Sequence, residues 1–262
     1  MKKNASQYYL PILFFIVIIL IWQYLSSRTV VAFWILPSPK EVIQVFKEFP
    51  ELIWSHMKPT IIESVSGLLL ATILGVLTAL ALHSSKIIKQ IFYPYLVVSQ
   101  TIPIIAVAPL IVLWFGYGIP AKIFVVVLMC FFPIALGLYD GLKQVSQEQI
   151  RLLKSMGASD WKIYRYLKIP ASLPTFFTGL KLAATYSVMA AVIGEWLGGN
   201  AGLGIYLTRS TKSFRTASVF AAIIVIILLS LAMFGIVALI DRILLSWQYK
   251  KIEEYEDISS FN

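Results

Sequence analysis

The sequence predicts an all-α integral membrane protein with about six transmembrane helices, and three observations lead to that prediction. Hydrophobic residues make up 59% of the 262 residues and charged residues only 13%, whereas soluble domains carry about 25% charged residues. The mean hydropathy is +0.82. Long apolar runs alternate with short charged segments, the longest of which covers residues 146–174. The net charge of +9 lies mostly in these short segments, so membrane topology explains it better than binding to nucleic acid.

The first apolar run covers residues 8–25 and follows two lysines. No small-x-small cleavage site follows the run, so we expect an uncleaved span whose N-terminus lies inside. Next, Ser38-Pro39-Lys40-Glu41 predicts the start of an interfacial helix. The apolar face of this helix would carry Val42, Val45, Phe46 and Phe49.

The second predicted span covers residues 59–82 and has a face of small residues. A small residue occurs at every fourth position, as is typical of close helix packing in membranes. These residues are Gly67, Ala71, Gly75 and Ala79. Glu63 lies near the start of the span, where a carboxylate either faces an aqueous cavity or sits at the headgroup level. We favour the headgroup interpretation.

The third predicted span covers residues 91–114 and contains Pro94, Pro103 and Pro109. Three prolines predict a bent or interrupted helix, which a membrane tolerates only where protein or water satisfies the freed backbone groups. Gln100 and Thr101 lie at mid-depth. We therefore take 99–103, with Gln100, Thr101 and Pro103, as the best candidate for lining a solute pathway. A kinked packing helix without solute contact is the alternative.

The remaining spans are predicted at residues 121–139, 175–197 and 217–240. Small side chains line one face of the fifth span, and the opposite face carries Lys181 and Glu195, which are further pathway candidates. Lys181 could equally extend along the helix to the cytoplasmic surface. Residues 198–216 are expected to form an external loop with Arg209, Lys212 and Arg215.

The charged segment 146–174 predicts two short helices that meet at Gly157. Ser146 and Gln149 form a capping-box pattern at the start of the first helix. Gly157 suits the left-handed residue that ends a helix, and Ser159 can cap the second one. Pro170 and Pro174 are expected to end that second helix.

No pattern for catalysis or metal binding is apparent. His56 and His83 are isolated, and Cys130 lies inside an apolar run, where it would fill space facing lipid or the core. No glycine-rich phosphate loop followed by Lys-Ser/Thr occurs in the sequence. We therefore do not expect the chain itself to be an enzyme.

The charged segment carries a resemblance to a known family. Gly157, followed after nine residues by Leu167-Lys168-Ile169-Pro170, resembles the EAA loop of permease subunits of bacterial ABC importers. The Glu-Ala-Ala places are degenerate and hold Arg151, Leu152 and Leu153. Residues 36–39, 100–103, 108–110, 113–116, 194–195 and 202–204 resemble the nitrate/sulfonate/taurine-type branch of these permeases.

The resemblance implies the type I ABC importer permease fold, with a cytoplasmic helix–Gly–helix coupling loop at 140–173. It implies a multi-pass protein of the bacterial plasma membrane with both termini cytoplasmic. Partners would be cytoplasmic ATP-binding subunits that hold ATP and Mg, an external solute-binding protein and a second permease copy; this chain would hold no cofactor. The implied coupling residues are Arg151, Leu152, Leu153, Met156, Gly157, Ala158, Trp161, Ile169 and Pro170.

On this basis the chain divides into an N-terminal span with an external segment (1–58), a permease core (59–243) and a cytoplasmic tail (244–262). The expected substrate is a small polar solute such as a sulfonate, nitrate or a thiamine-precursor pyrimidine, and the run 194–199 favours the pyrimidine. The alternative is a stand-alone secondary transporter or channel. Such a protein would need mid-membrane coupling-ion residues or an inverted repeat, and neither is visible in the sequence.

Overall fold

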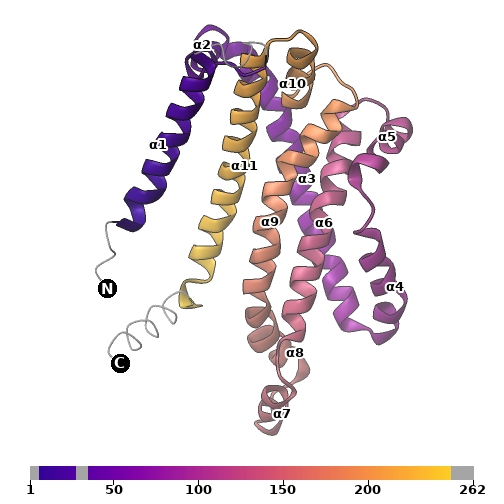
Figure 1. Cartoon of the computed structure of the whole chain (residues 1–262). Coiled ribbons are helices and arrows are strands. Elements are labelled where there is room, and N and C mark those ends of the chain that lie inside the picture. The colour runs from indigo at the N-terminus through magenta and orange to yellow at the C-terminus, as the bar shows by residue number, and fades with distance from the viewer. Residues whose placement is uncertain (1–5, 28–34, 249–262) are drawn as a thin grey trace.

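The computed structural model describes residues 6–27 and 35–248, and every regular element within these two ranges is a helix (Figure 1). The elements are α1 (Ser6–Ser27), α2 (Pro39–Glu48), α3 (Pro50–Ser84), α4 (Lys86–Ser99), α5 (Ile104–Phe115), α6 (Ile119–Lys143), α7 (Gln147–Ser155), α8 (Asp160–Ile163), a π-helical turn (Tyr164–Lys168), α9 (Ile169–Trp196), α10 (Leu203–Lys212) and α11 (Thr216–Leu244). Five segments are long and apolar enough to cross a membrane, or six if α4 and α5 together form one broken span. The predicted all-α membrane fold is confirmed.

The core of the bundle is α6, which packs most extensively against α9 and α3. On α3, Ala71 and Ala79 are buried, and side chains at Gly67 and Gly75 would collide with Val126 and Ile134 of α6. The predicted small-residue face is therefore the contact surface with α6. Small residues of α9 pack on the other side of α6 in the same way, since a Cβ at Gly179 would overlap the α6 backbone. Cys130 is buried in this core rather than facing lipid.

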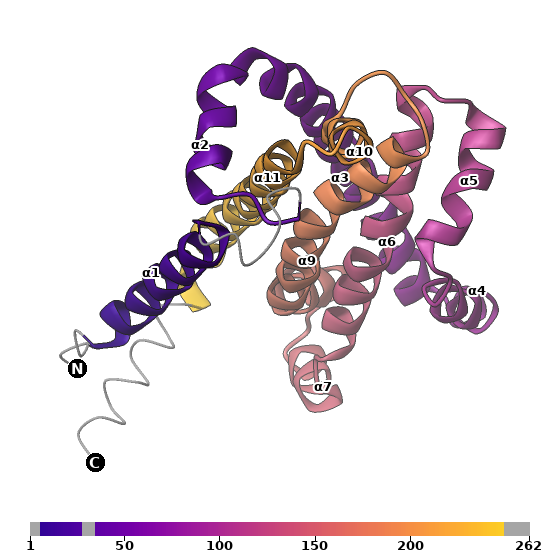
Figure 2. The same cartoon turned by 45° about the horizontal axis from the view of Figure 1, so that its top comes forward.

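The two ends of the bundle carry different short elements (Figure 1). The hairpin of α7 and α8 forms one end, and the first described residues of α1 and the last turn of α11 lie on the same side of the molecule but do not extend as far. The opposite end carries α2 and α10. Helix α1 stands at the periphery beside α11, away from α6 and α9 (Figure 2). Trp22 of α1 donates a hydrogen bond to the Pro37 carbonyl at 2.9 Å, and its ring lies 5.5 Å from that of Phe220 on α11.

Helix α2 begins as its sequence predicts. Ser38 and Glu41 form a complete capping box, with Pro39 in the first turn. Val42 and Val45 are buried against the bundle and Phe46 is partly buried, whereas Phe49 is exposed. Phe49 follows the last turn of α2, where the chain already turns into α3, so it leaves the packing face.

Three sequence predictions about helix ends are wrong. Helix α3 starts at Pro50 rather than at 59 and includes Pro59 in its interior. The segment 198–216 is not only a loop, because it contains α10. Pro170 and Pro174 do not end the second hairpin helix, which continues into α9. The Ile169 N–H bonds to the Tyr164 carbonyl, five residues back, and this widened turn makes room for the Pro170 ring.

Candidate functional site

The hairpin at one end of the bundle has the geometry that its sequence predicts. Gly157 has φ +80°, a left-handed conformation. Its N–H donates to the Lys154 carbonyl and the Ala158 N–H donates to the Leu153 carbonyl, both at 3.0 Å, which together form a Schellman motif at the end of α7. Ser146 and Gln149 form the capping box of α7, and Ser159 caps α8. Local sequence rules therefore fix this turn without help from the rest of the bundle.

The hairpin presents apolar side chains to its surroundings. Leu152, Met156 and Trp161 are 62%, 74% and 67% exposed, while Leu153 and Ala158 are half-buried. The other predicted coupling residues are the exposed Arg151 and, where α9 begins, Ile169 and Pro170. An exposed group of large apolar side chains on a polar hairpin is typical of a protein–protein contact.

The base of the hairpin rests on the end of α3. The Lys168 ammonium lies 3.0 Å from Nε2 of His83, and the His83 ring packs beside Tyr164. These residues come from the π-helical turn and from α3. His83 is isolated in the sequence, and no local pattern links it to Lys168, 85 positions away. The contact therefore joins the hairpin to α3, which packs against α6 in the core.

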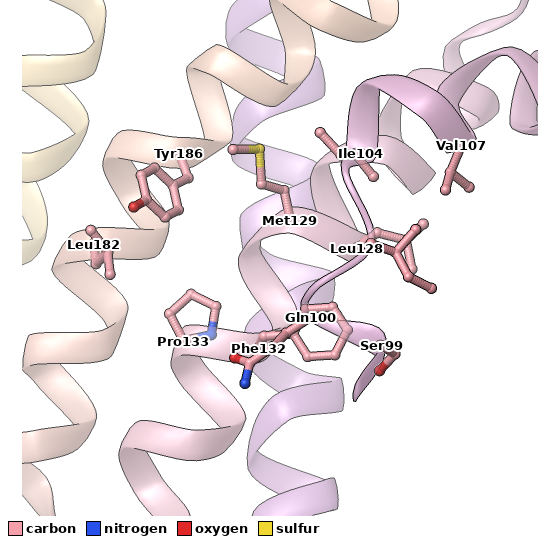
Figure 3. Close-up of a pocket in the computed structure, with 11 residues that line it drawn as sticks. Ser99, Gln100, Ile104, Val107, Leu128, Met129, Phe132, Pro133, Leu182 and Tyr186 are labelled. Atoms are coloured by element: carbon pink, nitrogen blue, oxygen red, sulfur yellow. The ribbon is translucent and has the colours of Figure 1, made fainter. Parts of the chain in front are cut away.

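The predicted third span is interrupted where its prolines indicated. Helices α4 and α5 meet at an angle of 102° across residues 100–103. Beside the break lies a cavity of about 660 Å³, between the break, α6 and α9 (Figure 3). It is lined by Ser99, Gln100, Ile102, Ile104, Val107, Leu128, Met129, Phe132, Pro133, Leu182 and Tyr186. None of these eleven side chains is charged. Of the predicted pathway residues, Gln100 lines this cavity, while Thr101 and Pro103 lie in the exposed break beside it.

Lys181 lies apart from that cavity and makes an ion pair. Its ammonium is 3.0 Å from the carboxylate of Asp241 on α11, and Asp241 is buried. The ion pair links α9 to α11, and the role of Lys181 in a pathway stays a prediction. The side chain contacts a neighbouring helix instead of reaching only toward the membrane surface.

Glu195 and Glu63 belong to one buried polar cluster near the end of the bundle that carries α10. The Lys122 ammonium of α6 pairs with Glu63 of α3 at 2.9 Å, and both side chains are almost fully buried. Glu195 of α9 is also fully buried and accepts a hydrogen bond from Thr60 at 2.6 Å. The interpretation of Glu63 as a headgroup-level carboxylate is therefore wrong, because a lysine from another helix compensates its charge inside the protein.

The same cluster holds the chain between α9 and α10. The Lys122 ammonium donates to the Ala201 carbonyl at 3.3 Å, and Nδ1 of His56 lies within 3.1 Å of both backbone polar atoms of Gly202. The Leu203 N–H donates to Thr60 at 3.0 Å. Side chains from separate helices thus bind one short connection, and no local sequence pattern predicts these contacts.

The fold is shared with the transmembrane subunits of ABC transporters. One chain in the crystal structure of an amino acid ABC transporter superposes with a TM-score of 0.63 at 17% identity, covering 76% of this chain and 97% of that one. A family model for the binding-protein-dependent transport system inner membrane component matches residues 71–245. The chain belongs to this family and is an ABC importer permease.

Several relatives of this permease have names that state a solute, among them formylaminopyrimidine, riboflavin, aliphatic sulfonates and taurine. The formylaminopyrimidine transport permease protein ThiX of Halalkalibacterium halodurans is 38% identical over 95% of this chain and 100% of its own length. The riboflavin transport system permease protein RibX of Chloroflexus aurantiacus is 31% identical over 88% of this chain and 87% of its own. Both are similar to this chain along nearly its whole length.

Proposed function

We propose that this permease couples to cytoplasmic ATP-binding subunits through the α7–α8 hairpin, and the exposed apolar side chains of the hairpin carry this proposal. Leu152, Met156 and Trp161 are large and exposed, and they sit on a short rigid turn. When such side chains become buried against a partner protein, they contribute most of the binding free energy, and basic residues around them steer docking. ATP and Mg would be held by those partner subunits. The hairpin and both termini would then lie in the cytoplasm.

The exposed break between α4 and α5 supports a second permease copy. Gln100, Thr101, Ile102 and Pro103 are all exposed in the single chain. Irregular backbone inside a membrane is tolerated only against protein or water, since lipid offers no hydrogen bonds. The face that carries the break would therefore point toward a second copy and an aqueous pathway between the two. The cavity in Figure 3 would open onto that pathway.

The cavity lining favours a neutral heteroaromatic solute over a sulfonate or nitrate. An anion moved into an apolar cavity needs a compensating charge, and none of the eleven lining side chains carries one. Tyr186 and Phe132 offer aromatic surface, and Gln100 offers an amide. A substituted pyrimidine suits this lining. The 38% identity to a formylaminopyrimidine permease supports the same class.

The opposite end of the bundle would receive the external solute-binding protein. Arg209, Lys212 and Arg215 are exposed on α10 and just after it. Their charge would attract an acidic surface of the binding protein. Phe214, 80% exposed between them, adds an apolar contact.

Charge substitutions in the hairpin test the coupling proposal. We expect Leu152→Asp/Met156→Asp to lose the ATP-binding subunits during purification in mild detergent, because two carboxylates would replace the apolar contact. The amount of permease in the membrane should not change, since both side chains are exposed. The measurement is the ratio of co-purified ATPase to tagged permease from cells that express the native gene neighbourhood.

Phe214→Asn is the matched control for this substitution. Phe214 is equally exposed but lies at the opposite end of the bundle, with φ +53°, a conformation that asparagine tolerates. We expect this variant to keep its ATPase. Normal ATPase recovery with the doubly substituted hairpin would refute docking at this surface.

A further inference from the structure

Helix α9 extends from the hairpin to the opposite end of the bundle. It continues directly from the π-helical turn after α8, and it ends at Trp196, one residue beyond Glu195 (Figure 1). A single helical segment therefore joins the proposed ATPase-docking hairpin to the buried cluster around Glu195. Along a continuous helix a displacement at one end reaches the other end, because each turn is hydrogen-bonded to the next.

The Glu195 side chain caps the N-terminus of α10. Its Oε2 accepts the Gly204 N–H at 2.6 Å, and its Oε1 accepts the Thr60 hydroxyl at 2.6 Å. Thr60 in turn accepts the Leu203 N–H at 3.0 Å. The first two N–H groups of α10 are thus bound by side chains from α9 and α3, where a helix otherwise relies on its own capping residue. The carboxylate also meets the positive end of the α10 dipole.

The chain that connects α9 to α10 is held by side chains of other helices and not by regular backbone structure of its own. Residues 197–202 form no helix or strand, and they contain Gly198, Gly199 and Gly202 in conformations with positive φ. The backbone of a glycine-rich segment is flexible by itself, so this segment transmits displacement only through the side chains that bind it. At Gly202 a side chain would overlap the Glu195 carboxylate, so the backbone approaches that carboxylate as closely as a glycine allows. The hydrogen bonds made by Glu195, and not residues 197–202, therefore connect α9 to α10 most directly.

We propose that Glu195 is the positioning residue through which α10 and α9 move together, so that a solute-binding protein docked on α10 stimulates ATP hydrolysis at the hairpin. This inference rests on the proposed function, which places the binding protein at α10 and the ATPase at α7 and α8. Glu63 and Lys122 form a balanced ion pair beside the cap. Neutralising Glu195 consequently leaves no lysine without a partner.

The test compares ATP hydrolysis by the purified complex in nanodiscs with and without its co-expressed solute-binding protein. Glu195→Met keeps the side-chain volume but removes both acceptors. We expect stimulation by the binding protein to fall by about fivefold or more, within the usual range of coupling between two sites, while basal hydrolysis persists. Glu195→Gln retains one acceptor for the Gly204 N–H and should restore most of the stimulation.

Two further variants separate transmission from local stability. His56→Ala removes a contact between α3 and Gly202 but leaves the Glu195 cap in place, so stimulation should persist. Thr60→Val removes a partner of Glu195 at nearly constant volume and should reduce stimulation, whereas Thr60→Ser keeps the hydroxyl and should not. If the complex with Glu195→Met fails to assemble, the comparison of Thr60→Val with Thr60→Ser provides the test.

Two outcomes would overturn the inference. One is full stimulation in Glu195→Met or, where that variant does not assemble, in Thr60→Val. The other is a proportional loss of basal and stimulated hydrolysis, which would make the cluster a purely structural element. A wild-type complex without any ATPase, or without stimulation by the binding protein, would instead refute the proposed function on which the inference rests.

Discussion

Gly157→Val is expected to abolish solute uptake while leaving the permease inserted in the membrane. Gly157 ends α7 at φ +80°, where a non-glycine residue costs roughly 1–2 kcal/mol and a β-branched one more. A Cβ at this position would meet no other atom within 4 Å. The substitution therefore strains the turn without disturbing any packing of the bundle. The hairpin would reorient, and its apolar side chains would no longer face the ATP-binding subunits together.

Gly157→Asn is the control, because asparagine enters the left-handed conformation more readily than other side chains. It should keep most of the uptake at the same level of membrane-inserted protein. The measurement is ATP-driven uptake, normalised to permease in the membrane fraction. Uptake by Gly157→Val at the wild-type rate would show that the geometry of this turn does not matter for coupling.

Lys122→Met is expected to cause the largest loss of stability among the substitutions considered. Lys122 is the charge partner of Glu63, with side chains 7% and 1% exposed, and Glu195 is buried in the same cluster. Removing one member of a buried ion pair leaves an uncompensated charge and typically costs about 3–5 kcal/mol. The substitution also removes the contact with the Ala201 carbonyl. The melting temperature of the purified permease should fall sharply.

The double variant Glu63→Gln/Lys122→Met provides the control for charge. It removes both members of the pair together, so Glu63 is no longer a buried carboxylate without its lysine, and Glu195 keeps its hydrogen bonds to Thr60 and Gly204. Its melting temperature should recover much of the loss seen with Lys122→Met. A double variant less stable than Lys122→Met alone would mean that the two side chains act independently, contrary to the pairing in the structure.

The parts of the fold that the sequence predicts well are those that local chemistry determines. The helix start at Ser38, the capping box at Ser146 and the left-handed Gly157 depend on neighbours within a few residues, and all three are confirmed. The interrupted third span follows from its prolines, and the small-residue face of α3 follows from a four-residue period. In each case the determining residues lie close together in the sequence.

The buried cluster could not be predicted in this way, because its members come from three helices far apart in the sequence. Lys122 falls at the start of the predicted fourth span, where no partner was assigned to it, and Glu63 was taken as a headgroup-level carboxylate. The predicted order of the spans nevertheless indicates that three residues of the cluster lie at one end of the bundle. If successive spans alternate in direction, then Glu63, Lys122 and Glu195 all fall at the same end of their helices. The continuation of the hairpin into α9 was missed because prolines usually end a helix, and the π-helical turn here removes that constraint.

ATP-driven uptake into proteoliposomes tests the central claim most directly. The permease and its co-purified ATP-binding subunits would be reconstituted with ATP inside the vesicles. The solute-binding protein and labelled formylaminopyrimidine would be added outside. We predict that uptake requires ATP, the binding protein and an intact α7–α8 hairpin. An excess of unlabelled taurine should not reduce this uptake. Solute counterflow catalysed by this chain alone, without ATP or partner subunits, would contradict the account.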